Sequence, residues 1–264
     1  MKYVKCPKCG KEVKLDVAKT IDEEEDFRLH FITSGIMKTP ELSVLEAQKE
    51  IQAFAGRMQR MFTMVQELLT LSSTSGGKKK SNQETEFNTL FSRIEKYESI
   101  SDNLELEIAN YLDQVSDAHL SDDTKAKIRG MLREISELES IGDSCYNMAR
   151  TISRKHQGKE DHFNEEQYNH LHQMMGLTDQ SLTQMNQLIS GRKDYFDVNR
   201  CYNIENEINN FRDQLKSQNI IDVNNHKYTY AVGTIYMDLI NSCEKLGDYV
   251  VNVVEARTGT RMRG

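Results

Sequence analysis

The chain repeats Glu139-Ser-Ile-Gly-Asp143-Ser-Cys-Tyr-Asn147 as Glu244-Lys-Leu-Gly-Asp248-Tyr-Val-Val-Asn252, 105 residues later. A second pair, Asn103-Leu-Glu105-Leu-Glu107-Ile108 and Asn203-Ile-Glu205-Asn-Glu207-Ile208, is offset by 100 residues. The two pairs occur in the same order along the chain. An ordered double match of this kind predicts an internal duplication.

The duplicated stretches carry apolar residues at steps of three and four, which is typical of helices with one buried face. The 264 residues contain two prolines, Pro7 and Pro40, so the chain from Glu41 onward lacks the commonest helix breaker. Six long helices are therefore expected. Their approximate ranges are 40–72 after Thr39, 121–157, 164–190, 194–217 and, after Asp222, 223–257. The second helix follows the polar linker 72–80 and carries the apolar stripe from Phe87 to Val115.

The predicted fold is all-α, with two tandem three-helix bundles related by internal duplication, behind a short irregular N-terminal extension. Antiparallel packing of neighbouring helices follows from the short connections. The expected divisions are an extension over 1–38, a first bundle over 39–158, a second bundle over 159–258 and a tail over 259–264.

Composition excludes several classes of function. The chain has 34 Lys and Arg against 41 Asp and Glu, a net charge of −7, which argues against general nucleic-acid binding. No run approaches the ~20 apolar residues that a membrane-spanning helix needs. The N-terminus lacks an apolar signal-peptide core, so a cytoplasmic protein is expected. No nucleophile–base pair, phosphate loop or cofactor fingerprint appears, and no catalytic residue or enzymatic activity is predicted.

Each repeated motif places two carboxylates and one amide on a single helix face, at positions i, i+4 and i+8. These residues are Glu139, Asp143 and Asn147 in the first copy, and Glu244, Asp248 and Asn252 in the second. Carboxylates one turn apart can share a metal ion through oxygen ligands. The alternative is a solvated acidic stripe that binds nothing.

The preceding helix of the first repeat offers a facing acidic set, Glu98, Asp102 and Glu105, which could complete an oxygen-rich site. The matching positions of the second repeat are Val198, Tyr202 and Glu205, so a second site should be weaker or absent. Gly142 and Gly247 precede the motif aspartates, and they predict that another helix approaches closely at each point.

The paired Glu-x-x-Gly-Asp-x-x-x-Asn signature, on the last helix of each three-helix repeat, resembles the PhoU family of all-α regulators of bacterial phosphate uptake. The resemblance covers roughly residues 41–258. It implies bound metal, such as iron, zinc or magnesium, on the acidic faces of the bundles. The residues it points to are Glu139, Asp143, Glu244 and Asp248, with Asp102 and Glu105 facing the first pair and Asn147 and Asn252 supporting the ligands.

The resemblance also implies partners, namely a membrane phosphate transporter or a phosphate-sensing kinase, and a possible homodimer. The stretch from Phe27 to Ala47 is similar to the segment that joins the membrane part of bacterial sodium/phosphate cotransporters to their cytoplasmic PhoU-like domain. This finer resemblance implies a location peripheral to, or tethered at, the inner membrane.

Cys6-Pro-Lys-Cys9 resembles one half of a zinc ribbon or knuckle. A closed structural zinc site needs four ligands, and the chain has no second Cys-x-x-Cys. Three alternatives stay open: His30 completes the zinc site, a residue of a dimer mate completes it, or no zinc site forms.

The sequence thus favours a regulator that acts through protein–protein contact and binds metal. A generic helical scaffold with solvated acidic stripes is the main alternative. A metal-dependent hydrolase of phosphate esters is the third, and it would require an open metal site with a positioned water.

Overall fold

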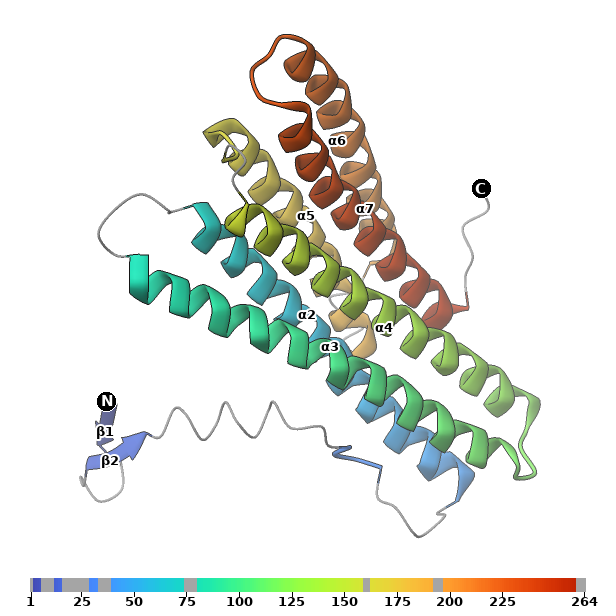
Figure 1. The fold of residues 1–264 in the computed structure, drawn as a ribbon. Helices are drawn as coiled ribbons and strands as arrows, with labels where there is room; N and C mark the ends of the chain where they lie inside the picture. Colours follow the sequence, from blue (N-terminus) through green and yellow to red (C-terminus); the bar gives the residue numbers. More distant parts are fainter. Residues whose placement is uncertain are drawn as a thin grey trace.

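The computed structural model describes residues 2–5, 12–15, 29–32, 39–73, 80–158, 162–191 and 197–259. Within them lie six long helices (Figure 1). Their bounds are α2 (Pro40–Ser73), α3 (Lys80–Ser116), α4 (Asp122–Gln157), α5 (Glu165–Ile189), α6 (Val198–Asn224) and α7 (Tyr230–Thr258). The predicted all-α class is confirmed.

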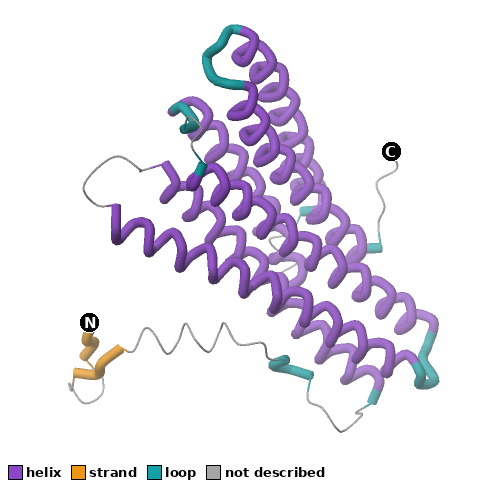
Figure 2. Tube along the Cα trace, in the orientation of Figure 1, coloured by secondary structure: helices purple, strands orange, loops and turns teal. Residues whose placement is uncertain are grey.

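The helices form two groups of three in chain order. Helices α2, α3 and α4 all contact one another, and so do α5, α6 and α7. The groups meet where α4 packs on α7 and α2 packs on α5. Figure 2 shows the helices as long rods, and the described connections at 117–121 and 225–229 are short, as expected for tandem antiparallel bundles.

The apolar stripes read from the sequence form one continuous core. On α2, Ala47, Ile51, Met58 and Met61 are fully buried, and Cys145 of α4 and Cys243 of α7 lie in the same core. Burial of these stripes, rather than helix propensity alone, holds such long helices in place.

Local capping explains where several helices begin. The Ser121 side chain accepts a hydrogen bond from the Thr124 amide at the start of α4. Asn164 and Gln167 form a reciprocal capping box at the start of α5. Both starts agree with the sequence prediction.

The predicted break between the last two helices, from about Ser217 to Asp222, is wrong. Asp222 lies inside α6, which continues to Asn224, and α7 begins at Tyr230 with Thr229 as its N-cap. Asp222 is 4% exposed and accepts hydrogen bonds from Gln218 and Lys227. Its polar side chain therefore serves a buried contact rather than a cap.

The N-terminal extension differs from the irregular segment expected. Strands β1 (Lys2–Lys5) and β2 (Glu12–Leu15) pair antiparallel, with Lys2 opposite Leu15 and Lys5 opposite Glu12. Cys6 and Cys9 fall between these strands in sequence and lie outside the described residues.

A short part of the extension is anchored on α2. The Glu50 carboxylate, 1% exposed, accepts hydrogen bonds from the backbone amides of His30 at 2.9 Å and Phe31 at 2.7 Å. The His30 ring also contacts Arg57, with Nη2 3.1 Å from Nε2. A buried carboxylate needs such donors, so the 29–32 segment and α2 depend on each other.

The contact between the two bundles is close. A Cβ atom at Gly130 of α4 would lie 2.9 Å from the carbonyl oxygen of Ala256 on α7. Next to this contact, Arg257 pairs with Glu134 at 3.1 Å, and the Glu134 side chain is 2% exposed. Burial raises the pKa of Glu134 to about 7, although the charge of Arg257 opposes the rise.

Candidate metal centre

Three carboxylates from α3 and α4 converge on one point. Glu98 and Asp102 of α3 and Asp143 of α4 each offer a ligand oxygen, and these oxygens lie within 4.8 Å of one another. Glu105 and Glu139 extend the same face, since the charge of Glu105 acts on Glu139. We call these five residues the first acidic cluster. The convergent trio is an arrangement that could hold a metal ion.

The electrostatics of the first acidic cluster favour a cation. Burial, with the nearby charges of Asp143, Glu105 and Asp102, raises the pKa of Glu139 to about 7. Burial and Asp102 raise the pKa of Asp143, while burial, Asp102 and Asp143 raise that of Glu98. Ionised carboxylates held together in this way repel one another until a cation neutralises them. The donor set therefore fits a metal that prefers oxygen ligands.

The glycine beside Asp143 sets how closely α3 and α4 approach. A Cβ atom at Gly142 would lie 2.7 Å from Oγ of Ser101 on α3 and 3.2 Å from Sδ of Met58 on α2. At Gly247, the nearest atom to an added Cβ is Cδ1 of Ile208 on α6, at 3.3 Å. Close helix approach at both motif glycines is thus confirmed, and it is tighter in the first bundle.

The second bundle brings together a different set of groups. Glu205 of α6 lies near Glu244 and Asp248 of α7, and these three residues form the second acidic cluster. The Arg212 guanidinium pairs with Glu244, and Asn209 donates a hydrogen bond to Glu205. Here the protein's own cation lies among the carboxylates. Arg212 was not anticipated from the sequence, because its distance from Glu244 along the chain hides the contact.

The two motif asparagines have different surroundings. Asn252 donates a hydrogen bond to Glu137 of α4 at 3.0 Å, which places its amide at the contact between the bundles. Asn147 lies two turns beyond Glu139 on α4 and is exposed. A supporting role for either residue toward a metal stays a prediction.

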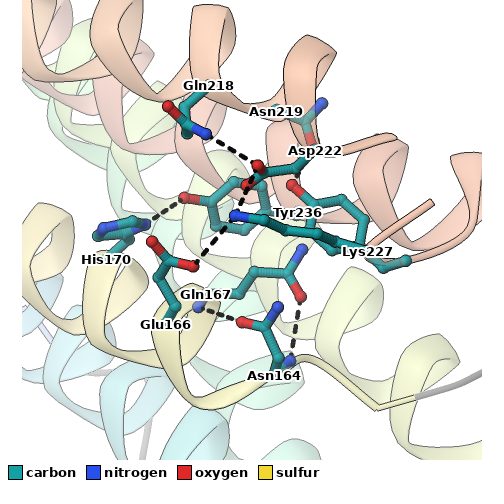
Figure 3. A network of polar contacts seen from close by, with 10 residues as sticks. Asn164, Glu166, Gln167, His170, Gln218, Asn219, Asp222, Lys227 and Tyr236 are labelled. Carbon is teal, nitrogen blue, oxygen red and sulfur yellow. Dashed lines mark hydrogen bonds and ion pairs between the residues drawn. The ribbon is translucent and has the colours of Figure 1, made fainter. Parts of the chain in front are cut away.

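A polar network near the α6–α7 turn, shown in Figure 3, was also not predicted from the sequence. Lys227 lies 2.8 Å from Asp222, and the ring of His170 on α5 is 3.1 Å from the Tyr236 hydroxyl (Nδ1 to Oη). The hydrogen bonds of Lys227 and Gln218 lower the pKa of Asp222, although burial opposes them. Lys227 also lies 3.9 Å from Glu166 of α5, so the network ties the turn to α5, a structural role that explains why polar groups are buried there.

A separate groove of about 760 Å³ lies between α2 and α3. Its charged lining consists of Glu67, Glu86 and Arg93. Carboxylates outnumber the cation, so the groove is poorly suited to binding a phosphate anion. It is also distinct from the first acidic cluster, none of whose residues lines it.

None of the described helices combines the length with the apolar character needed to cross a bilayer. No protein-family model matches the sequence, and no curated protein matches it either.

Solved structures with a similar fold do match. The phosphate transport system regulatory protein PhoU from Streptococcus pneumoniae superposes with a TM-score of 0.64 at 17% identity, over 84% of this chain and 98% of that one. PhoU from Pseudomonas aeruginosa gives 0.63 at 11% identity, over 83% and 99% of the two chains. At this identity the likeness concerns the fold, and the chain thus has the six-helix fold of the PhoU proteins, as the repeated motif predicted.

Proposed function

We propose that this chain regulates phosphate transport through contact with a membrane phosphate transporter or its signalling kinase, and that metal bound by the first acidic cluster stabilises the contacting form. The observation that carries the proposal is the convergence of Glu98, Asp102 and Asp143 on a PhoU-type scaffold. One of the matched structures is that of a phosphate transport system regulatory protein.

The ligands for the metal come from two helices, which gives the ion a structural consequence. Glu98 and Asp102 belong to α3 and Asp143 to α4, so a bound cation would cross-link the two helices. Neutralising the mutual repulsion of the carboxylates would also stabilise their packing. Glu139 and Glu105 would serve as further ligands or as nearby countercharges. In this proposal the chain's work is binding and recognition, with no chemical step.

Metal binding is tested by replacing two ligands from opposite helices. The variant Asp102→Asn/Asp143→Asn keeps the shape of both side chains while removing two charges. We expect it to lose the metal that the wild-type chain carries, measured by mass spectrometry of the metal content after purification. Glu107→Gln/Asp113→Asn, on exposed positions of α3, removes the same charge elsewhere and should keep the metal. Equal metal in both double variants would contradict the assignment.

The partner is tested by using the full chain as bait on host membranes, prepared with phosphate plentiful or limiting. Recovery of a phosphate transporter or a phosphate-sensing kinase, identified by mass spectrometry, is the expected result. We further expect the Asp102→Asn/Asp143→Asn bait to recover less of that partner. Recovery of soluble proteins alone under both conditions would refute the regulatory role and favour a generic helical scaffold.

A further inference from the structure

The two acidic clusters differ in the charges that surround them. In the first acidic cluster, the charges that shift the pKa values of Glu98, Glu139 and Asp143 all come from other carboxylates. In the second acidic cluster, burial raises the pKa values of Glu244 and Asp248, and the charge of Arg212 opposes that rise. One cluster thus has unbalanced negative charge, and the other contains a cation from the chain itself.

Arg212 is held in place at both edges of its guanidinium group. Nη1 pairs with Oε1 of Glu244 on α7, and Nε lies 3.0 Å from Oδ1 of Asp213. The Arg212 side chain is 25% exposed and that of Glu244 is 19% exposed, so water screens the pair only in part. A guanidinium does not lose its proton in a protein, which makes the positive charge permanent.

The other two carboxylates of the second acidic cluster, Glu205 and Asp248, also interact with groups of the chain itself. Glu205 is 8% exposed and accepts a hydrogen bond from Asn209, one turn along α6. Asp248 is stabilised in its charged form by Arg212. A divalent ion entering this cluster would have to displace or approach a fixed positive charge, which would repel it.

We propose that Arg212 acts as the built-in cation of the second bundle, so that the chain binds divalent metal in its first bundle alone. The inference rests on the metal role proposed above for the first acidic cluster. It gives the duplicated halves different properties, because the first bundle responds to metal supply and the second is held together without it.

The internal repeat identifies the substitution that tests this inference. By the offset of 100 residues that relates Glu105 to Glu205, Arg212 matches Leu112 of the first repeat, a fully buried residue of α3. Arg212→Leu therefore copies the first bundle and leaves Glu205, Glu244 and Asp248 without their cation. Arg212→Lys keeps a positive charge at the site. Arg200→Leu, at an exposed position of the same helix, removes one arginine elsewhere.

Mn²⁺ alone is a suitable probe, because it prefers carboxylate oxygens over the thiols of Cys6 and Cys9. Bound and free Mn²⁺ are separated by electron paramagnetic resonance at neutral pH, using the full chain. The Asp102→Asn/Asp143→Asn variant should bind no Mn²⁺, and adding Arg212→Leu to that background should restore binding. Arg212→Lys and Arg200→Leu, added to the same background, should not restore it.

The outcomes separate this inference from the proposed function. Mn²⁺ bound by Asp102→Asn/Asp143→Asn with Arg212 intact, and lost on adding Glu244→Gln, would overturn the inference. So would failure of Arg212→Leu to create a site in a chain that circular dichroism shows to be folded. If instead the wild-type chain binds no Mn²⁺ while Arg212→Leu does, the role of Arg212 as the cation that excludes metal from the second bundle stands, and the metal role of the first acidic cluster fails.

Discussion

Replacing Gly142 by alanine should destabilise the protein, although alanine normally favours a helix. The new methyl group would lie 2.7 Å from Oγ of Ser101 and 3.2 Å from Sδ of Met58, and both side chains are fully buried. Inserting a methyl group into a packed core costs about 1–3 kcal/mol. The helix propensity of alanine over glycine returns about 1 kcal/mol. The net loss is therefore about 0–2 kcal/mol.

Two other helical glycines provide matched controls. At Gly176 of α5 nothing lies within 4 Å of an added Cβ, so Gly176→Ala should show the whole gain of about 1 kcal/mol. At Gly247 the obstacle is the end of the flexible Ile208 side chain, at 3.3 Å, so Gly247→Ala should fall between the two. The expected order of stability is Gly176→Ala, then Gly247→Ala, then Gly142→Ala.

Urea denaturation followed by helical circular dichroism measures this order through the transition midpoints. Adding Ser101→Ala to Gly142→Ala removes the nearest atom and should recover part of the loss. If Gly142→Ala proves as stable as Gly176→Ala, the close approach of α3 to α4 is wrong, and with it the geometry of the first acidic cluster.

Three further results are expected. Because the folded pKa of Glu139 is raised from 4.5 to about 7, metal-free protein should lose stability as the pH rises through that window, and Glu139→Gln should flatten this part of the Tm profile. Glu50→Gln should speed amide hydrogen exchange at His30 and Phe31, which donate to Glu50; unchanged exchange would show that the 29–32 segment is held by other contacts. Asp222→Asn should cost about 1–3 kcal/mol at neutral pH. Since the folded pKa of Asp222 is lowered, the stability that its carboxylate contributes is lost as the pH falls, so the difference in Tm between wild type and Asp222→Asn should shrink in acid. A difference that stays constant as the pH falls would count against the network of Figure 3.

The sequence predicted the helices best where periodicity and capping agree. Asn164 is followed three residues later by Gln167, and this local pair forms the capping box that starts α5. Asp222 was predicted to lie just before the last helix, but it lies inside α6, where its side chain is buried and pairs with Lys227. Local signals do not reveal which polar side chains the tertiary packing will bury.

The candidate site was likewise predicted where local spacing decides it, and not where contacts between distant residues do. Spacing on one helix placed Glu139 and Asp143 on a common face, and the facing acids Glu98 and Asp102 were found because their own spacing is regular. The positive charge of Arg212 beside the second acidic cluster was not predicted. Arg212 on α6 pairs with Glu244 on α7. In the sequence, a single arginine in a helical pattern cannot be told from an ordinary surface cation, because the pattern does not show which helix will pack against it.

Helix α4 takes part in both the acidic face and the seam with the other half of the molecule. Gly130 and Glu134 touch α7, while Glu139 and Asp143 lie toward α3. These four residues occupy about 20 Å of one continuous rod, at 1.5 Å per residue. A rod that is packed this closely cannot shift at one end of that stretch and stay still at the other. A change in the spacing of α3 and α4 would therefore displace α7 as a rigid body. A partner protein bound to α7 would be moved by this displacement even if the residues that contact it keep their arrangement.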